Sequence, residues 1–185
     1  MFLFLVPLII GFACNLASAF TSVYSAKWGE QKGTILTVIL RDIFGIPVWG
    51  MGFVVAASAE SPMLFTPVLW LVVSGWLLVA AGAVVIVIAL TTIRRRAAAP
   101  TARDALAKSG IYARIRHPIH SGTILEFLGI LLIRPSATVA LACALGLIWV
   151  LLQTRFEEWD VLRRIPGYRE YMNRVPRFIP RVHRP

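Results

Sequence analysis

Long apolar runs alternate with short polar segments along the whole chain. A helix needs roughly 20 apolar residues to cross the hydrocarbon core of a bilayer, which is about 30 Å thick. Five runs approach or exceed this length, at about residues 1–22, 34–59, 67–93, 118–133 and 136–154. The pattern predicts an all-α integral membrane protein with about five transmembrane helices, folded as one membrane domain over residues 1–185.

The last two apolar runs are separated only by the polar sequence Arg134-Pro135-Ser136. So short a break predicts a helical hairpin. The first arm, at about 118–133, would be about 24 Å long at 1.5 Å per residue, which is marginal for a full span. Because its arms are antiparallel, the hairpin should bring the polar segments before and after it to the same side.

Clusters of basic residues give the expected orientation. Cytoplasmic loops of membrane proteins are enriched in Lys and Arg. The three N-terminal spans, within 1–93, end at Arg94-Arg95-Arg96, and the chain is basic again from Arg155 onward. We expect the N-terminus outside, and the polar connector and a short C-terminal helical segment in the cytosol.

The first apolar run also carries a possible processing signal. Ala17-Ser18-Ala19 resembles a signal-peptidase site. A secretory signal begins with basic residues, and Met1-Phe2-Leu3-Phe4 has none. We therefore interpret this run as a retained first span.

The charge balance excludes one class of partner. The chain is 58% hydrophobic and 15% charged, with a net charge of +10. Residues 1–93 are neutral, and the excess lies in 94–116 and 155–185, next to apolar runs. Basic segments placed in this way face a membrane surface, so we expect a bilayer partner and no nucleic acid.

The two cysteines give no sign of a metal site. Cys14 and Cys143 each lie inside an apolar run. Buried cysteine usually behaves as a small hydrophobic residue. Two isolated thiols form no ligand cluster, so we expect no metal.

The segment that leads into the hairpin is the first candidate for chemistry. It contains Arg116, His117 and Pro118, followed by His120 and Gly122. Proline is favoured in the first helical turn, whose free N–H groups, beside an Arg and a His, can bind an anion or a carboxylate. The alternative is a basic turn that only contacts lipid headgroups.

Two further groups of polar residues border the hairpin. Glu126 lies inside its first arm, where an ionisable side chain usually faces a cavity or a partner helix. Arg155, Glu157 and Glu158 close the second arm, and Arg155 and Glu158 are spaced to pair on one helix face. These carboxylates could bind a ligand, or they could form a solvated charge cluster.

Tyr168 and Tyr171 lie three residues apart, shortly before Val175-Pro176. Tyrosines at such positions commonly anchor a helix at the headgroups.

The chain contains none of the sequence signatures GxGxxG, Walker A, HExxH or GxSxG. Any cofactor must therefore bind between membrane helices and short polar segments.

In this order, the motifs resemble those of the isoprenylcysteine carboxyl methyltransferase family. The resemblance covers about residues 100–182. It rests on a segment similar to RHPxYxG, an apolar hairpin, a segment similar to RxEE, and then YxxYxxxVP. It implies an integral-membrane methyltransferase that uses S-adenosyl-L-methionine without a Rossmann domain.

The resemblance also implies roles for residues of this chain. The implied cofactor site contains Tyr112, Arg116, His117, Pro118, His120, Gly122, one of Glu157 and Glu158, Tyr168 and Tyr171. Arg155, with one of the glutamates, would orient the methyl acceptor and serve catalysis. Glu126 is a candidate to border the acceptor because of its place in the apolar arm, not because of the resemblance. The acceptor would be a lipophilic small molecule or a lipid, with O- or N-methylation both open.

The chain departs from the family pattern at two places. His120 stands where the family usually has tyrosine, and the spacing from Glu158 to Tyr168 is about one residue short. The equivalent glutamate is therefore open. Two other functions fit the composition: a membrane reductase for sterol-like substrates that uses NADPH, and a non-catalytic scaffold or transporter subunit.

Overall fold

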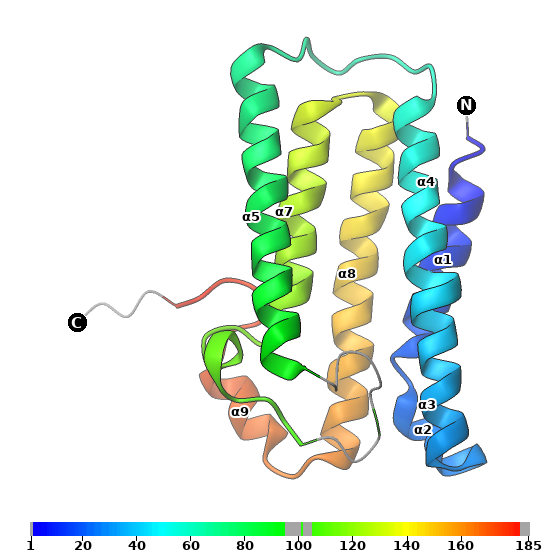
Figure 1. Ribbon diagram of the computed structural model, residues 1–185, viewed down its shortest axis with the longest axis vertical. Helices are drawn as coiled ribbons and strands as arrows, with labels where there is room; N and C mark the ends of the chain where they lie inside the picture. Colours follow the sequence, from blue (N-terminus) through cyan, green and yellow to red (C-terminus); the bar gives the residue numbers. More distant parts are fainter. Residues whose placement is uncertain (1, 95–100, 102–104, 182–185) are drawn as a thin grey trace.

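The computed structural model describes residues 2–94, 101 and 105–181, and within this part every regular element is a helix (Figure 1). The predicted all-α fold is thus confirmed. In chain order the elements are α1 (Leu5–Ser18), α2 (Thr21–Trp28), α3 (Glu30–Val38), the π-helical η1 (Ile39–Gly45), α4 (Ile46–Ser58), α5 (Leu69–Ile93), the 3-10 helix η2 (Gly110–Ala113), α7 (Pro118–Ile133), α8 (Ala137–Arg164) and α9 (Tyr168–Arg174).

Three helices of the described part are long and apolar enough to cross a membrane. They are the continuous helix Glu30–Ser58, which joins α3, η1 and α4, together with α5 and α8. Helices α1 and α2 meet at a bend of 64° and pass the same test only as one broken span. Helix α7 has 16 residues and falls below this length. The expected count of five spans is therefore not confirmed; three or four are supported.

The predicted hairpin is formed by α7 and α8, which run side by side in opposite directions (Figure 1). Ser136 caps the second arm, since its hydroxyl accepts a hydrogen bond from the Val139 N–H at 3.4 Å. Pro135 precedes this cap, and a proline at this position does not allow helix α7 to continue. Helix α8 continues to Arg164, so its last turns carry polar residues beyond the apolar run.

An aromatic cluster joins the two halves of the bundle. Phe12 of α1 stacks on Trp149 of α8 with ring centroids 5.1 Å apart. Phe53 of α4 stacks on Phe127 of α7 at 4.9 Å. Trp49 contacts all four of these rings. Offset aromatic packing of this kind fixes how the N-terminal helices meet the hairpin.

One end of the bundle gathers the polar segments. The α7–α8 turn lies at one end in Figure 1, and η2, α9 and the C-terminal end of α8 lie at the other. The side chain of Ser22 in α2 and its N–H both donate to the buried carboxylate of Asp160 in α8. Arg164 also pairs with Asp160, at 3.1 Å. These contacts hold the bent helix pair α1–α2 against the end of α8.

Candidate functional site

Three segments that are distant in sequence meet at this polar end. They are the loop leading into α7, the last turns of α8, and the tail that follows α9. The Arg116 N–H donates to the Pro176 carbonyl at 2.9 Å, and the His117 N–H donates to the Arg177 carbonyl at 3.1 Å. The Ser121 hydroxyl donates to the Phe178 carbonyl at 2.8 Å. The tail is thereby fixed along the start of α7.

Glu158 lies at the centre of this arrangement and is 3% exposed. Its Oε1 accepts hydrogen bonds from Arg116 Nε at 3.2 Å and from Arg177 Nε at 3.1 Å. Arg177 Nη2 binds the other oxygen, Oε2. A buried carboxylate is tolerated only when it is paired in this way, so Glu158 ties the three segments together.

Arg116 has a second function in the same place. Its Nη1 donates to the carbonyl oxygens of Met172 and of Val175, the latter at 2.6 Å. These carbonyls lie in the last turn and C-cap of α9, where four carbonyls lack intrahelical partners. A cation there also favours the helix dipole. One arginine therefore caps α9 and pairs with α8.

His117 is buried between the two glutamates. Its Nε2 lies 3.1 Å from Glu158 Oε1, and its Nδ1 lies 3.4 Å from Glu157 Oε2. Burial alone would lower the pKa of His117, but the hydrogen bonds to Glu157 and Glu158 outweigh it and raise the pKa above its ordinary value. Glu157 is the more accessible glutamate, with its side chain 34% exposed.

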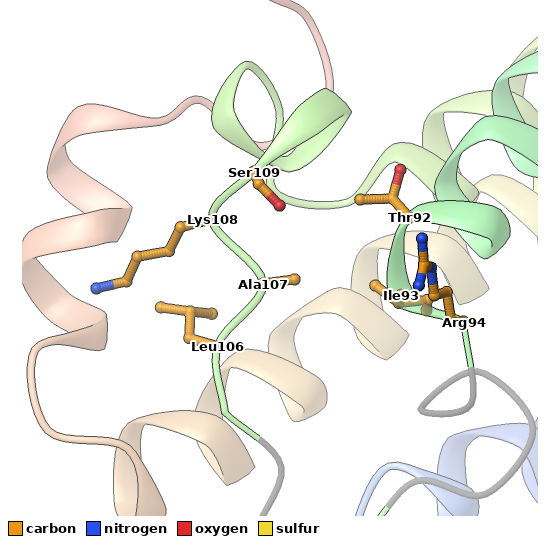
Figure 2. A pocket seen from close by; sticks show the side chains of 7 residues that line it. All are labelled: Thr92, Ile93, Arg94, Leu106, Ala107, Lys108 and Ser109. Carbon is orange, nitrogen blue, oxygen red and sulfur yellow. The ribbon is translucent and has the colours of Figure 1, made fainter.

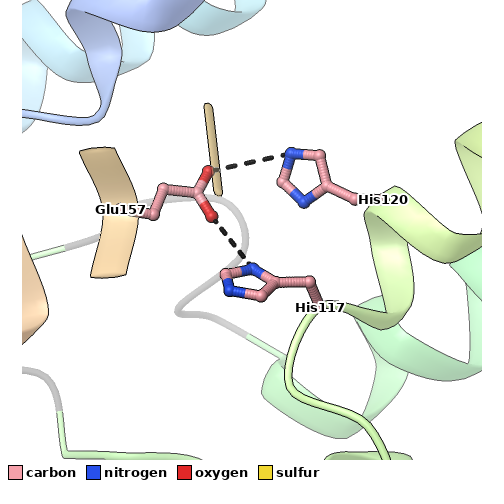
Figure 3. Close-up of side chains that lie close together, drawn as sticks. All are labelled: His117, His120 and Glu157. Atoms are coloured by element: carbon pink, nitrogen blue, oxygen red, sulfur yellow. Dashed lines mark ion pairs between the residues drawn. The ribbon is translucent and has the colours of Figure 1, made fainter. Parts of the chain in front are cut away.

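His120 follows one turn later on α7 and points toward the same glutamate (Figure 3). Its Nε2 lies 4.0 Å from Glu157 Oε1, which is too far for a hydrogen bond. Its ring packs against Trp149 with centroids 5.8 Å apart. Gln153, one turn before Glu157, donates to Glu157 Oε1 at 2.9 Å.

Two buried polar atoms on α8, close to Glu157 and His120 respectively, lack partners in the described part of the chain. They are the Gln153 amide oxygen and the Trp149 indole N–H. Both residues are at least nine-tenths buried. Unsatisfied buried polar groups are rare in folded proteins and often mark a place where water or a ligand binds.

A tyrosine cluster forms the other side of the polar end. Tyr168 and Tyr171 are buried and pack with Val175 against Leu106. The Tyr171 hydroxyl donates to the Tyr112 carbonyl at 2.6 Å, which joins α9 to η2. Burial raises the pKa of Tyr171 to about 12 and raises those of Tyr112 and Tyr168 further.

A pocket of about 770 Å³ opens next to this cluster (Figure 2). The end of α5 forms one wall, and the chain just before η2 forms the other. Its lining residues are Thr92, Ile93, Arg94, Leu106, Ala107, Lys108 and Ser109. Leu106 is shared between this pocket and the tyrosine cluster. The volume is within the range of sites that bind small molecules.

The phospholipid methyltransferase model matches residues 70–169, which is more than half of the chain. The chain belongs to the phospholipid methyltransferase family. Searches of curated proteins and of solved structures found no match.

The matched region contains the start of α7 and the end of α8, but not most of α9 or the tail that follows it. In this chain the phospholipid methyltransferase match runs from α5 through the hairpin to the start of α9. It supports a membrane methyltransferase. It does not distinguish isoprenylcysteine carboxyl methyltransferases from other members, so that narrower assignment remains a proposal.

The predicted site residues of this methyltransferase fall into two groups. The structure brings most of them to the polar end, namely Tyr112, Arg116, His117, Pro118, His120, Glu157, Glu158, Tyr168 and Tyr171. The other three, Arg155, Gly122 and Glu126, lie outside this cluster. The Arg155 side chain is exposed, and Glu158 pairs with Arg116 and Arg177 instead of with Arg155.

Gly122 and Glu126 both face α5 rather than the polar end. A Cβ on Gly122 would lie 2.6 Å from the Gly82 carbonyl oxygen, so this glycine permits close helix packing. Glu126 is half-buried, and its side chain lies against the backbone of Gly82. Among the described residues, no hydrogen bond or ion pair links Gly122 or Glu126 to the residues around Glu158.

Sequence reasoning missed two residues of the site. Arg177 follows Val175-Pro176, and Gln153 lies within the apolar run at 136–154, so neither is among the predicted site residues. The one available signal for Gln153 was its position one turn before Glu157. The sequence held no signal that Arg177 would displace Arg155 as the partner of Glu158.

Proposed function

We propose that the protein is a membrane-embedded methyltransferase that transfers a methyl group from S-adenosyl-L-methionine to a lipophilic acceptor. A carboxylate, such as that of a prenylated cysteine, is the first candidate acceptor. One observation carries the proposal: the two polar segments on either side of the hairpin meet in one buried, hydrogen-bonded cluster, in a chain of a methyltransferase family.

The chemistry asks mainly for alignment and shelter from water. Methyl transfer from a sulfonium is an in-line displacement, in which the acceptor's lone pair forms the new bond as the carbon–sulfur bond breaks. A carboxylate acceptor needs no base, whereas an amine must lose a proton. A site that fixes both reactants in a water-poor place accelerates such a step strongly.

We assign the cofactor to the polar end beside the tyrosine cluster. Tyr112, Tyr168 and Tyr171 would supply apolar and polar surface there, and the pocket between the end of α5 and residues 106–109 adjoins this cluster through Leu106. Glu158 is fully engaged by two arginines and a histidine, so we assign it to holding the walls together. Glu157 is the glutamate that remains accessible to a ligand.

The acceptor would reach this site from the bilayer. Large apolar side chains are exposed along α5 and α8, where lipid would surround the helices, including Trp70, Trp76, Leu77, Ile148 and Leu151. A lipophilic molecule can therefore approach laterally while its polar end reaches the end of the bundle. With the basic segments in the cytosol, as the orientation rule predicts, the site would lie at the cytosolic interface.

Ligand binding tests the proposal directly. The full chain, purified in detergent, should unfold at a higher temperature with S-adenosylhomocysteine, because a ligand of the native state stabilises it by mass action. NADPH serves as the comparison ligand. No shift with millimolar S-adenosylhomocysteine, or a shift only with NADPH, would overturn the proposal.

The acceptor can be found without guessing it. Purified enzyme, labelled S-adenosyl-L-methionine and a lipid extract should yield a labelled product that partitions into organic solvent. Base-labile label would indicate a methyl ester, and base-stable label would indicate N-methylation. Label that never leaves the cofactor would count against a lipophilic acceptor.

A further inference from the structure

We propose that His117, His120 and Glu157 bind a divalent transition-metal ion, with zinc as the expected ion. One ligand atom from each residue lies within 4.8 Å of the other two. Two imidazoles and one carboxylate are a common donor set for such metals, and three protein ligands leave a coordination position open. The three ligands belong to the residues assigned to the cofactor site, so the ion would lie inside that site, and the proposal goes beyond the proposed methyltransferase function without requiring methyl transfer for its test.

The local fold explains how the three ligands converge. His117 precedes α7 and His120 lies in its first turn, so their side chains lie on the same face of the chain as it enters the helix. Glu157 comes from the facing side of α8, with its two oxygens directed at the two rings (Figure 3). Pro118 between the histidines is completely buried, which fixes the start of the helix.

The distances are compatible with a shared ion. Bonds of about 2.0–2.1 Å in a tetrahedral site place donor atoms about 3.4 Å apart. His117 Nδ1 and Glu157 Oε2 are 3.4 Å apart. His120 Nε2 is 4.0 Å from Glu157 Oε1, so a small inward shift of His120 would complete the set.

The surrounding groups are those that a metal site requires. A ligating histidine usually donates its second ring N–H to a carboxylate, and a ligating carboxylate is itself hydrogen-bonded. The second nitrogen of His117 lies 3.1 Å from Glu158 Oε1, and Arg116 and Arg177 hold that carboxylate in place. Gln153 donates to Glu157.

The unpartnered amide oxygen of Gln153 is independent evidence for a ligand. It is buried beside Glu157 and has no hydrogen-bond partner in the described residues. A water on the open position of the metal would be a donor of the kind that this oxygen lacks. His120 likewise makes no hydrogen bond with any residue that the structure describes, although its ring is buried.

The competing arrangement contains no metal. In it, a protonated His117 is shared between Glu157 and Glu158, and His120 is a buried ring packed on Trp149. The two arrangements differ in a measurable way, because only the first requires His120 as a ligand.

Metal analysis of the intact protein decides between them. The full chain, purified in detergent without chelators, should contain one zinc or similar ion per chain. Stripped protein should recover the ion on titration with Zn²⁺, and with Co²⁺ should develop the visible absorption of a low-coordinate site. His120→Tyr and Glu157→Gln should lose the ion, whereas Glu170→Gln, which changes an exposed carboxylate on α9, should retain it.

Variants around the ligands extend the test. Gln153→Leu should weaken zinc affinity by roughly 10–100-fold, as loss of a supporting hydrogen bond does in known sites. Metal-free wild-type protein that takes up neither Zn²⁺ nor Co²⁺ would overturn the proposal, as would equal metal content in wild type and His120→Tyr. A thermal shift with S-adenosylhomocysteine in such metal-free protein would leave the methyltransferase function standing, so the two failures are distinguishable.

Discussion

Gly82 of α5 and Gly122 of α7 face each other so closely that neither position has room for a side chain. A Cβ on either residue would lie 2.6 Å from the other's carbonyl oxygen. Gly75 and Gly129 repeat this contact two turns away. Small residues that let helix backbones approach are typical of packing inside membranes. Gly122 thus has a structural task that is separate from the cofactor role implied by the sequence.

Substitution of either glycine should destabilise the bundle. Gly122→Ala or Gly82→Ala forces a methyl group into a backbone carbonyl and should cost about 1–3 kcal/mol, as overpacking does. Gly50→Ala on α4 is the matched control, because its Cβ would meet nothing within 4 Å. Unfolding in detergent, followed by circular dichroism, measures the difference. If Gly122→Ala unfolds like wild type but loses S-adenosylhomocysteine binding, Gly122 belongs to the cofactor site.

The two adjacent glutamates should respond very differently to the same change. Glu158→Gln leaves Arg116 and Arg177 without their buried anion and should cost about 3 kcal/mol. Glu157→Gln should change the free energy of unfolding much less, since that side chain is 34% exposed. Thermal unfolding of both variants, without ligand, provides the comparison. Equal destabilisation would show that Glu158 is not the centre of the network.

Local signals predicted the hairpin well. The run at 118–133 became α7 with the same bounds, because Pro118 suits a first turn and Arg134-Pro135 interrupts the helix. The bend between α1 and α2 was not predicted, since the run at 1–22 is mostly apolar and contains no charged residue. That bend accompanies the contact between Ser22 and Asp160, which are 138 residues apart in sequence. Asp160 and Arg164 form the ion pair that their i, i+4 spacing on one helix favours.

The site was predictable in place but not in detail. A hairpin must return the chain to its starting side, so the meeting of the two polar segments followed from the pattern alone. The pattern did not predict which arginine binds Glu158. Spacing on one helix allowed Arg155, but Arg116 and Arg177 come from segments whose backbones are hydrogen-bonded together beside Glu158. Such tertiary competition leaves no trace in the local sequence.

The hydrogen bond from the Tyr171 hydroxyl to the Tyr112 carbonyl should hold η2 in place against α9. Tyr171→Phe removes this bond of 2.6 Å and should cost about 1 kcal/mol, with faster hydrogen exchange at residues 109–113. Tyr168→Phe is the control, because its hydroxyl makes no hydrogen bond within the described chain. Hydrogen-exchange mass spectrometry resolves the two. Equal exchange in both variants would mean that α9 does not order η2.

The buried tyrosines also predict how stability depends on alkaline pH. Burial raises the pKa of Tyr171 from 10.0 to about 12, and those of Tyr112 and Tyr168 also rise. The native state therefore holds its phenolic protons more tightly than the unfolded chain does. The resulting stability is fully present below pH 10 and is lost as the pH rises from there toward 12. Phenolate absorbance should appear near pH 10 in denaturant but later in the folded protein, and Tyr171→Phe should remove part of the late step. Coincident titrations in the two conditions would show that these tyrosines are exposed to water.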